Sequence, residues 1–364
     1  MKKIFLQILL LTFGFSCFAA SVYKINDESI ATYRKALDSF NSNDYGTALH
    51  CAEDAITLRK MQMEKQIKVL TNALSARAVK KEGDSIHAVL AILGERGEKE
   101  SIAIIKYYLE KKGEEYFDDS VNNVMEYIKG SIAFPEAHKL IGDIYKLEGE
   151  YDFAENYYQL ALKNADVLDI PDEKYEILYM LAEISRLNND LPKMETRLLN
   201  ILVEDSVFKD EILWGAMEQT IKRDTEGSME KFFTLYRTNS YNSIRAYKEL
   251  AEYYANAGEN EKALHFAALN VLTGFSRIME ILQDRGDTDF EYVNLADFFA
   301  KIKPYYDIQQ WAIDNKIWEG YDFFASLTAK MGCKNFARGI FKALVSECPQ
   351  AYWQKQAVIK LQKL

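Results

Sequence analysis

The stretch that decides the fold spans residues 137–162 and has the sequence AHKLIGDIYKLEGEYDFAENYYQLAL. Its apolar residues recur at helical spacing on both sides of residues 148–150, which predicts two helices joined by a tight turn. Small residues stand at Gly142, Ala154 and Ala161 among large neighbours. Because glycine inside a helix costs roughly 1 kcal/mol relative to alanine, Gly142 predicts that another part of the chain comes close there.

The alternation of helix and short polar break continues along the chain, with predicted helices of about 12–17 residues. No run alternates as a strand would, and the 364 residues include only five prolines. Breaks this short make neighbouring helices antiparallel, so we predict an all-α fold of helix hairpins. The breaks lie at residues 41–44, 81–83, 94–98, 148–150, 188–192, 258–260 and 331–332.

The order of small and large positions in residues 137–162 recurs. With Ile141-Gly142, Tyr145, Gly149, Ala154, Tyr158 and Ala161, it resembles the 34-residue tetratricopeptide repeat (TPR). Further copies of this order occupy Leu250-Ala251, Tyr254, Gly258 and Ala263, and then Phe324-Ala325, Gly332, Ala337, Phe341 and Pro349. Weaker copies contain Ala36, Tyr45, Ala48 and Ala55, and Leu181-Ala182, Leu191 and Leu198. In the second strong copy, Asn270 stands where alanine is usual.

A second kind of repeat lies between these copies. Residues 88–113 resemble a degenerate HEAT-type repeat, in which a helix ends at Gly94 and apolar residues line the next helix. Both families stack helix pairs, so the resemblance implies an α-solenoid of antiparallel pairs. It also implies that Gly142 faces Ala154 across the hairpin, and that Ala161 lets the next hairpin stack closely.

The repeats divide the chain into four predicted segments. These are a leader (1–20), N-terminal TPR-like and HEAT-like repeats (21–134), central TPR-like repeats (135–238) and C-terminal TPR-like repeats (239–364). The last segment ends in a predicted capping helix over residues 351–364, with Lys355, Lys360 and Lys363 exposed. Two arrangements stay open: one superhelix, or two arms hinged near residues 239–243.

Residues 1–20 have the form of a secretory signal peptide. Lys2-Lys3 precede an apolar run over residues 4–15, and Ala19-Ala20 supply small residues for cleavage after Ala19. We therefore expect an exported protein of the periplasm or cell envelope. No later apolar run approaches the roughly 20 residues that a membrane-spanning helix needs.

Cys17 supports a second interpretation of the leader. Residues 15–17 form a loose lipobox, in which Cys17 would become a lipidated first residue and tether the protein to a membrane. Gly14 stands where an aliphatic residue is usual and counts against it.

Charge and cysteine content narrow the classes of partner. Removal of the leader takes away two lysines and no acid, which changes the net charge from −10 to −12. An acidic chain without a long Lys/Arg run predicts no nucleic-acid partner. Cys51, Cys333 and Cys348 remain, and this odd number indicates free thiols, with a Cys333–Cys348 bridge as the alternative.

The sequence contains no nucleophile elbow, phosphate loop or His-Glu-x-x-His motif, so we expect no enzyme, cofactor or resident metal. The four histidines are scattered, and none has a convincing second ligand three or four residues away. Acidic residues at 114–115 and 118–119 lack the alternation and central glycine of a calcium loop, which indicates a solvated face.

Partner binding is expected on the inner surface. In TPR proteins the first helix of each pair lines a groove, and the resemblance assigns eight residues to it: Lys139, Asp143, Lys146, Tyr179, Glu183, Arg186, Lys248 and Glu252. Family members that hold an acidic C-terminal tail use lysine and asparagine there, whereas Asp143 and Glu252 take the asparagine-like places in this chain. This mixed charge with tyrosine indicates a peptide or folded protein partner. An ordinary solvated face is the alternative.

These observations predict a non-catalytic scaffold for protein–protein interaction in a bacterial cell envelope. One alternative is a lipid-anchored accessory subunit of an envelope transport or assembly machine, which requires acylated Cys17. Another is an accessory of a cell-wall enzyme, but the repeat pattern runs nearly to Leu364 and leaves no room for a catalytic domain. The pattern specifies no oligomeric state.

Overall fold

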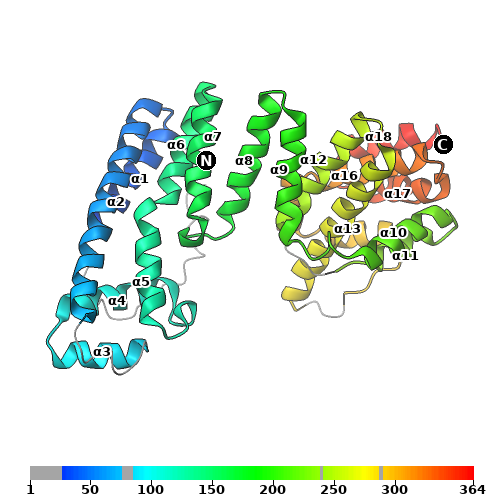
Figure 1. Cartoon of the computed structure of the whole chain (residues 1–364). Helices are drawn as coiled ribbons and strands as arrows, with labels where there is room; N and C mark the ends of the chain where they lie inside the picture. The colour runs from blue at the N-terminus through cyan, green and yellow to red at the C-terminus, as the bar shows by residue number, and fades with distance from the viewer. Residues whose placement is uncertain (1–26, 76–84, 238–240, 287–289) are drawn as a thin grey trace, which may run out of the picture. The chain divides into compact units, whose positions relative to one another are not determined.

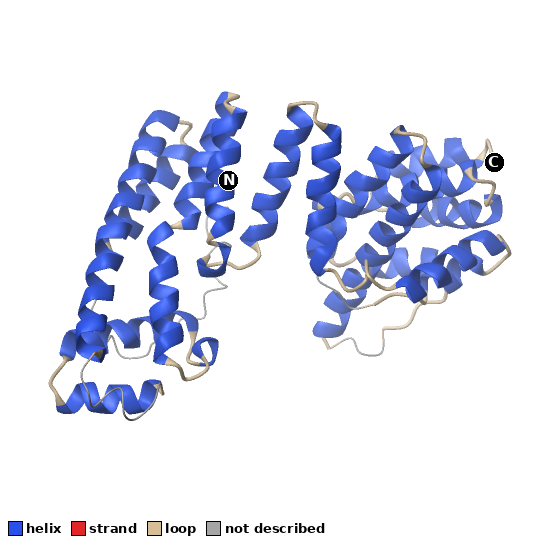
Figure 2. Cartoon of the chain, in the orientation of Figure 1, coloured by secondary structure: helices blue, strands red, loops and turns tan. Residues whose placement is uncertain are grey.

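The computed structural model describes residues 27–75, 85–237, 241–286 and 290–364, and helices fill most of them (Figure 1, Figure 2). Within these ranges there is no strand, and an isolated β-bridge joins Ser85 to Ser120. Helices follow one another in hairpins, which confirms the predicted all-α, helical-repeat solenoid class. The predicted leader, with Cys17, and the break at residues 81–83 lie outside the described residues.

The chain forms two compact units, residues 1–144 (unit 1) and 145–364 (unit 2). The division falls inside α6, whereas the sequence analysis placed a boundary after residue 134. The helices up to the division are α1 (Glu28–Asn41), α2 (Tyr45–Leu74), α3 (Ile86–Glu95), α4 (Lys99–Lys112), η2 (Glu115–Phe117), α5 (Val121–Gly130), η3 (Ser131–Ala133) and α6 (Pro135–Glu148). Those after it are α7 (Tyr151–Lys163), η4 (Ala165–Val167), α8 (Glu173–Leu187), α9 (Leu191–Ile201), η5 (Leu202–Glu204), α10 (Glu211–Arg223), α11 (Ser228–Phe233), η6 (Tyr241–Ser243), α12 (Ile244–Asn256), α13 (Asn260–Asp284), α14 (Leu295–Ile302), α15 (Tyr306–Asp314), α16 (Ile317–Lys330), α17 (Lys334–Glu347) and α18 (Ala351–Leu361).

Six hairpin turns share one backbone geometry. In each, a residue with positive φ follows the first helix, and the next amide donates to the carbonyl five residues earlier at 2.8–3.0 Å. This is the Schellman ending of a helix, which satisfies carbonyls that the helix leaves without partners. The positive-φ residues are Asn43 (61°), Gly97 (72°), Gly149 (82°), Asn189 (58°), Gly258 (81°) and Gly332 (94°). The turn predicted at Gly149 is thus confirmed, and the HEAT-like segment closes its hairpin in the same way.

In the two turns built on asparagine, the following residue also starts the next helix. The Asp44 carboxylate accepts a hydrogen bond from the Thr47 amide at 3.2 Å, and Asp190 accepts one from the Lys193 amide at 3.1 Å. An N-cap of this kind stabilises a helix by about 1 kcal/mol. The dipeptide Asn-Asp therefore ends one helix and begins another.

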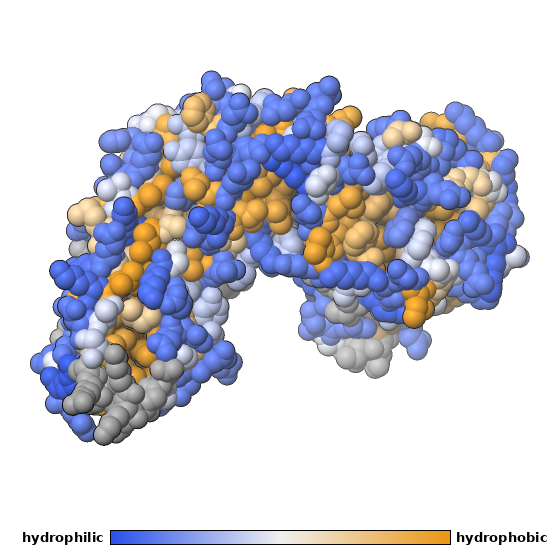
Figure 3. Space-filling model, viewed as in Figure 1, coloured by the Kyte–Doolittle hydropathy of each residue, from blue (hydrophilic) through white to orange (hydrophobic). Residues whose placement is uncertain are grey.

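The first hairpin of unit 1 packs through alanine. Ala36 of α1 and Ala48, Ala52 and Ala55 of α2 have no exposed surface, so the two helices approach closely. The 30 residues of α2 exceed the predicted helix length, and its second half packs against α4 and α5. Figure 3 shows polar side chains over most of this face and short apolar strips between helices, one of them beside α2.

Small residues also mediate packing in unit 2. Ala154, Tyr158 and Ala161 of α7 are fully buried and pack with Ile177, Leu181 and Ile184 of α8. This contact confirms that Ala161 lets the next hairpin stack. Gly142 is buried as well, but it belongs to unit 1, so its predicted contact with Ala154 stays a prediction.

The core of unit 2 is built around α13, whose 25 residues are buried on nearly every side and again exceed the predicted length. This helix packs against α12 and α16. A Cβ atom on Gly320 of α16 would lie 2.4 Å from the Asn270 Oδ1 atom, and one on Gly274 would lie 2.8 Å from Ile317 Cδ1. The side-chain amide of Asn270 donates to the Ile244 carbonyl at 2.9 Å. Asparagine, which stands here in place of the usual alanine, therefore links α13 to the start of α12.

The predicted capping helix is α18, and its lysines differ in environment. Lys355 and Lys363 are exposed as expected. The prediction of an exposed Lys360 is wrong, because its ammonium group pairs with the buried Asp322 carboxylate of α16 and donates to Ser326 Oγ at 2.9 Å. The pair holds α18 against α16.

Candidate functional site

Two of the predicted groove residues, Lys139 and Asp143, lie one turn apart on α6 in unit 1. Their Nζ and Oδ2 atoms are 3.4 Å apart, and both side chains are largely covered. The two charges therefore already compensate each other before any partner binds.

Three others meet in unit 2. The carboxylate of Glu183 on α8 forms two ion pairs, with Lys146 Nζ at 3.4 Å and with a guanidinium nitrogen of Arg186 at 3.8 Å. Arg186 keeps 58% of its side chain exposed, whereas Lys146 and Glu183 are mostly covered. Of this group, Arg186 is the residue that offers donors to a partner.

Lys248 of α12 is held between two carboxylates. Its ammonium group, 12% exposed, pairs with Glu252 one turn later and with Glu319 of α16 at 3.2 Å. Burial alone would lower the pKa of Lys248, but hydrogen bonds and attraction from the two glutamates outweigh it and raise that pKa. Lys248 is therefore a fixed, permanently charged part of the surface.

Tyr179 has a different place from the one expected. Its side chain is 7% exposed, its hydroxyl donates to the Asn242 carbonyl and accepts from the Ala246 amide at 3.0 Å, and Arg245 lies over its ring at 4.7 Å. Burial raises the pKa of Tyr179 well above its ordinary value. Its contacts place it in the packing between α8 and the start of α12, without an open face for a partner.

Three of the eight predicted residues border a hollow of about 550 Å³, here called the unit 2 hollow. Arg186, Lys248 and Glu252 line it. Leu191, Met194 and Ile244 provide apolar surface. The remaining lining residues are Arg245, Glu249, Tyr253, Asn256, Asp314, Asn315 and Lys316.

Sequence reasoning missed part of this lining. Asp314 and Lys316 come from the end of α15 and the turn before α16, which are far from α8 in sequence. No repeat position marks them. Arg245 could have been predicted, because it precedes Lys248 by one helical turn and so lies near the same face of the helix.

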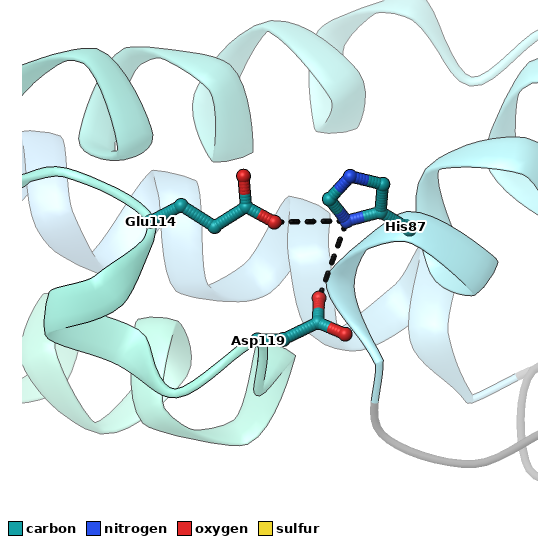
Figure 4. Close-up of side chains that lie close together, drawn as sticks. All are labelled: His87, Glu114 and Asp119. Atoms are coloured by element: carbon teal, nitrogen blue, oxygen red, sulfur yellow. Dashed lines mark hydrogen bonds and ion pairs between the residues drawn. The ribbon is translucent and has the colours of Figure 1, made fainter.

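A second group of charged residues gathers in unit 1, on separate segments (Figure 4). His87 is at the start of α3, while Glu114 and Asp119 flank η2. The His87 Nδ1 atom lies 2.9 Å from Glu114 Oε1 and 3.3 Å from Asp119 Oδ1. Among the described residues, they form the one group of three or more His, Cys, Asp or Glu side chains whose ligand atoms all lie within 4.8 Å of one another.

The cysteines in the described ranges are free thiols, as predicted. Cys51 and Cys333 are partly exposed and Cys348 is buried, which raises the pKa of the Cys348 thiol to about 11. The alternative bridge between Cys333 and Cys348 is not formed.

Within the described part of the chain, no helix combines the length and the apolar character needed to cross a bilayer. Of the two longest, α2 carries charged residues along much of its length, and α13 carries them near its two ends.

Comparison with known proteins finds a relative that matches most of the chain. No family model matches the chain. A protein of Treponema pallidum (strain Nichols), described only as an uncharacterized protein, is 31% identical over 326 residues. These residues make up 88% of this chain and 86% of that protein, so the likeness extends over both units. The chain therefore belongs to the same protein family as this Treponema pallidum protein.

Proposed function

We propose that the chain is a non-catalytic scaffold of the bacterial cell envelope, which binds a peptide segment of a protein partner in the unit 2 hollow. The observation that carries the proposal is the lining of this hollow. Cationic, anionic, amide and apolar side chains from α8, α9, α12 and α15 converge on one concave surface. Residues that the TPR resemblance assigned to partner binding are among them.

The lining favours a peptide that carries both signs of charge and an apolar side chain. Arg186 and Arg245 are each about half exposed, and arginine is among the residues that contribute most at protein interfaces. Glu249, Glu252 and Asp314 supply acceptors for a basic group. Leu191, Met194 and Ile244 offer apolar area that a partner would cover.

Export and scaffolding rest on other observations. The leader predicted over residues 1–20 supports a periplasmic or cell-envelope location. The TPR-like residue order and the six turns of identical geometry support a chain of stacked hairpins, a construction that typically provides extended binding surfaces.

Site-specific crosslinking in cells tests this function. A photoreactive amino acid replaces Arg186 or Lys316 in the hollow, and exposed Lys355 of α18 is the matched control position. We expect one partner to be crosslinked from both positions in the hollow and not from residue 355. The same adducts from all three positions, or none from the hollow, would contradict the proposal.

A charge reversal provides the quantitative test with the captured partner. Arg186→Glu is expected to weaken binding about tenfold, equivalent to 1.4 kcal/mol, while Lys355→Glu leaves the affinity unchanged. Equal effects of both substitutions would mean that overall charge, rather than the hollow, governs association.

A further inference from the structure

The spacing of His87, Glu114 and Asp119 is close to that of ligands around a metal ion. Two ligand atoms placed about 2.0–2.1 Å from Zn²⁺ at tetrahedral angles are about 3.3 Å apart. The distances from His87 Nδ1 to the two carboxylates are 2.9 and 3.3 Å. Both distances are within a few tenths of an ångström of this spacing, and the two carboxylates also bring ligand oxygens within 4.8 Å of each other.

The ligand types and their charge also suit a divalent transition-metal ion. Two carboxylates and one neutral imidazole compensate the double positive charge. An imidazole nitrogen is a favourable ligand for Zn²⁺ and its neighbours in the periodic table, whereas Ca²⁺ and Mg²⁺ prefer oxygen. Three protein ligands leave at least one position for water.

The fold orients this group independently of the ligand atoms themselves. The Ile86 amide donates to the Asp119 carbonyl at 2.9 Å beside the Ser85–Ser120 bridge, which joins the start of α3 to the turn after η2. Ser85 Oγ donates to Asp119 Oδ2 at 2.7 Å and leaves Oδ1 directed toward His87 (Figure 4). Hydrogen bonds of this kind from outside the ligand set commonly fix the orientation of a metal-binding carboxylate.

Side-chain exposures of 72% for His87 and about half for the two acids give a hydrated ion access from solvent.

We propose that His87, Glu114 and Asp119 form a binding site for one divalent transition-metal ion of the Zn²⁺ class, with Ser85 as a positioning residue. This differs from the sequence-based expectation of no resident metal. The site lies in unit 1 and is independent of the peptide-binding function proposed for unit 2.

Calorimetric titration of the chelator-treated protein with ZnCl₂ tests the proposal. We expect one Zn²⁺ per chain, with an affinity lowered at least tenfold by His87→Gln and by Asp119→Asn. Ser85→Ala, which keeps all three ligands, is expected to weaken binding by a smaller factor. Circular dichroism spectra establish that each variant stays folded.

His50 provides the matched control. It is an exposed histidine 3.5 Å from a single carboxylate, Asp54, on α2. His50→Gln is expected to leave Zn²⁺ affinity unchanged, and X-ray absorption of the zinc complex is expected to lose a nitrogen ligand only in His87→Gln. The proposal is overturned if the wild-type protein binds no Zn²⁺. It is equally overturned if a His87→Gln/Glu114→Gln/Asp119→Asn variant binds Zn²⁺ as the wild type does.

Discussion

At the scale of single residues, two glycines inside helices differ in the room around them: one has space for a side chain, and the other packs against a neighbouring side chain. Gly215 of α10 has no atom within 4 Å of where a Cβ would lie, whereas the Cβ on Gly320 of α16 would overlap Asn270. Gly215→Ala is therefore expected to stabilise the protein by about 0.5–1 kcal/mol, through helix propensity alone. Gly320→Ala is expected to destabilise it by about 1–3 kcal/mol, because Asn270 must shift or lose its hydrogen bond to Ile244. Urea denaturation measures both changes.

The double variant Gly320→Ala/Asn270→Ala is the control for this pair of glycines. Removal of the Asn270 side chain creates room for the added methyl group. The double variant is therefore expected to lose less unfolding free energy than the two single substitutions lose in sum. Strict additivity would show that Asn270 is not the obstacle.

His265 is expected to make stability depend on pH. It stacks on Trp214 with ring centroids 3.8 Å apart, and burial lowers its pKa from 6.5 to about 4. Between these values the unfolded chain binds the proton and the folded chain does not. The contribution of neutral His265 to the free energy of unfolding is therefore complete above pH 6.5 and is lost as the pH falls toward 4. After allowance for partial exposure, the loss is about 1–2 kcal/mol.

His265→Phe keeps an aromatic ring against Trp214 and removes the titrating group. The free energy of unfolding of the wild type and of the variant is measured between pH 7 and 4, and the difference between the two proteins is followed with pH. We expect the wild type to lose stability relative to the variant over this range. A difference that does not change with pH would contradict the assignment.

At the scale of elements, the turns were predictable and the helix lengths were not. Glycine or asparagine marks the turns and is followed by an acidic residue in five of the six, because each turn must supply a positive φ and then begin a new helix. α2 and α13 exceed the predicted length since no proline and no polar turn interrupts residues 45–74 or 260–284. The repeat pattern suggested shorter helices there, but the extra turns are covered by α4 and α5 in one unit and by α16 in the other.

The attachment of α18 to α16 gives a prediction at this scale. The Asp322 side chain is 7% exposed, and burial raises its pKa despite the pairing with Lys360. Lys360→Ala removes the counter-charge, and we expect a loss of about 1–3 kcal/mol, less than for a fully buried pair because Lys360 is one-third exposed. Lys355→Ala, on the solvent side of α18, is expected to stay within about 0.5 kcal/mol of the wild type.

Hydrogen exchange locates this effect on α18. Its amides are expected to exchange faster in Lys360→Ala than in Lys355→Ala. A double variant, Asp322→Asn/Lys360→Met, is expected to recover most of the lost stability, since it removes both charges together. Failure of this recovery would mean that α18 is held mainly by its apolar contacts.

At the scale of the whole molecule, two compact units predict two unfolding events. Stacked hairpins contact mainly their neighbours, so cooperativity need not extend through 364 residues. We expect urea unfolding to resolve two transitions. Gly320→Ala is expected to shift only the urea midpoint of the unit 2 transition. Ala48→Val, which overpacks the α1–α2 interface, is expected to shift only the midpoint of the unit 1 transition. A single transition displaced by both substitutions would show that the units unfold together.

The candidate sites were predictable to different degrees. Arg186, Lys248 and Glu252 could be placed on one surface because a helical period and a repeat resemblance relate them. Tyr179 has the same period, but a large ring at that position is buried by α12, which no local pattern reveals. His87 lies 27 positions before Glu114, and tertiary contacts such as the bridge between Ser85 and Ser120, which no local pattern marks, bring their segments together.

The shared turn geometry has a consequence for how such a chain can change over generations. Each junction is specified by one backbone conformation, and the Gly149, Gly258 and Gly332 turns have no atom within 4 Å of a would-be side chain. If a duplication or deletion begins and ends at such junctions, every hairpin that is kept retains its own turn. The neighbouring hairpins then join without a new linker. Gain and loss of whole hairpins is thus a route by which relatives can differ in length while the surfaces on either side are inherited intact.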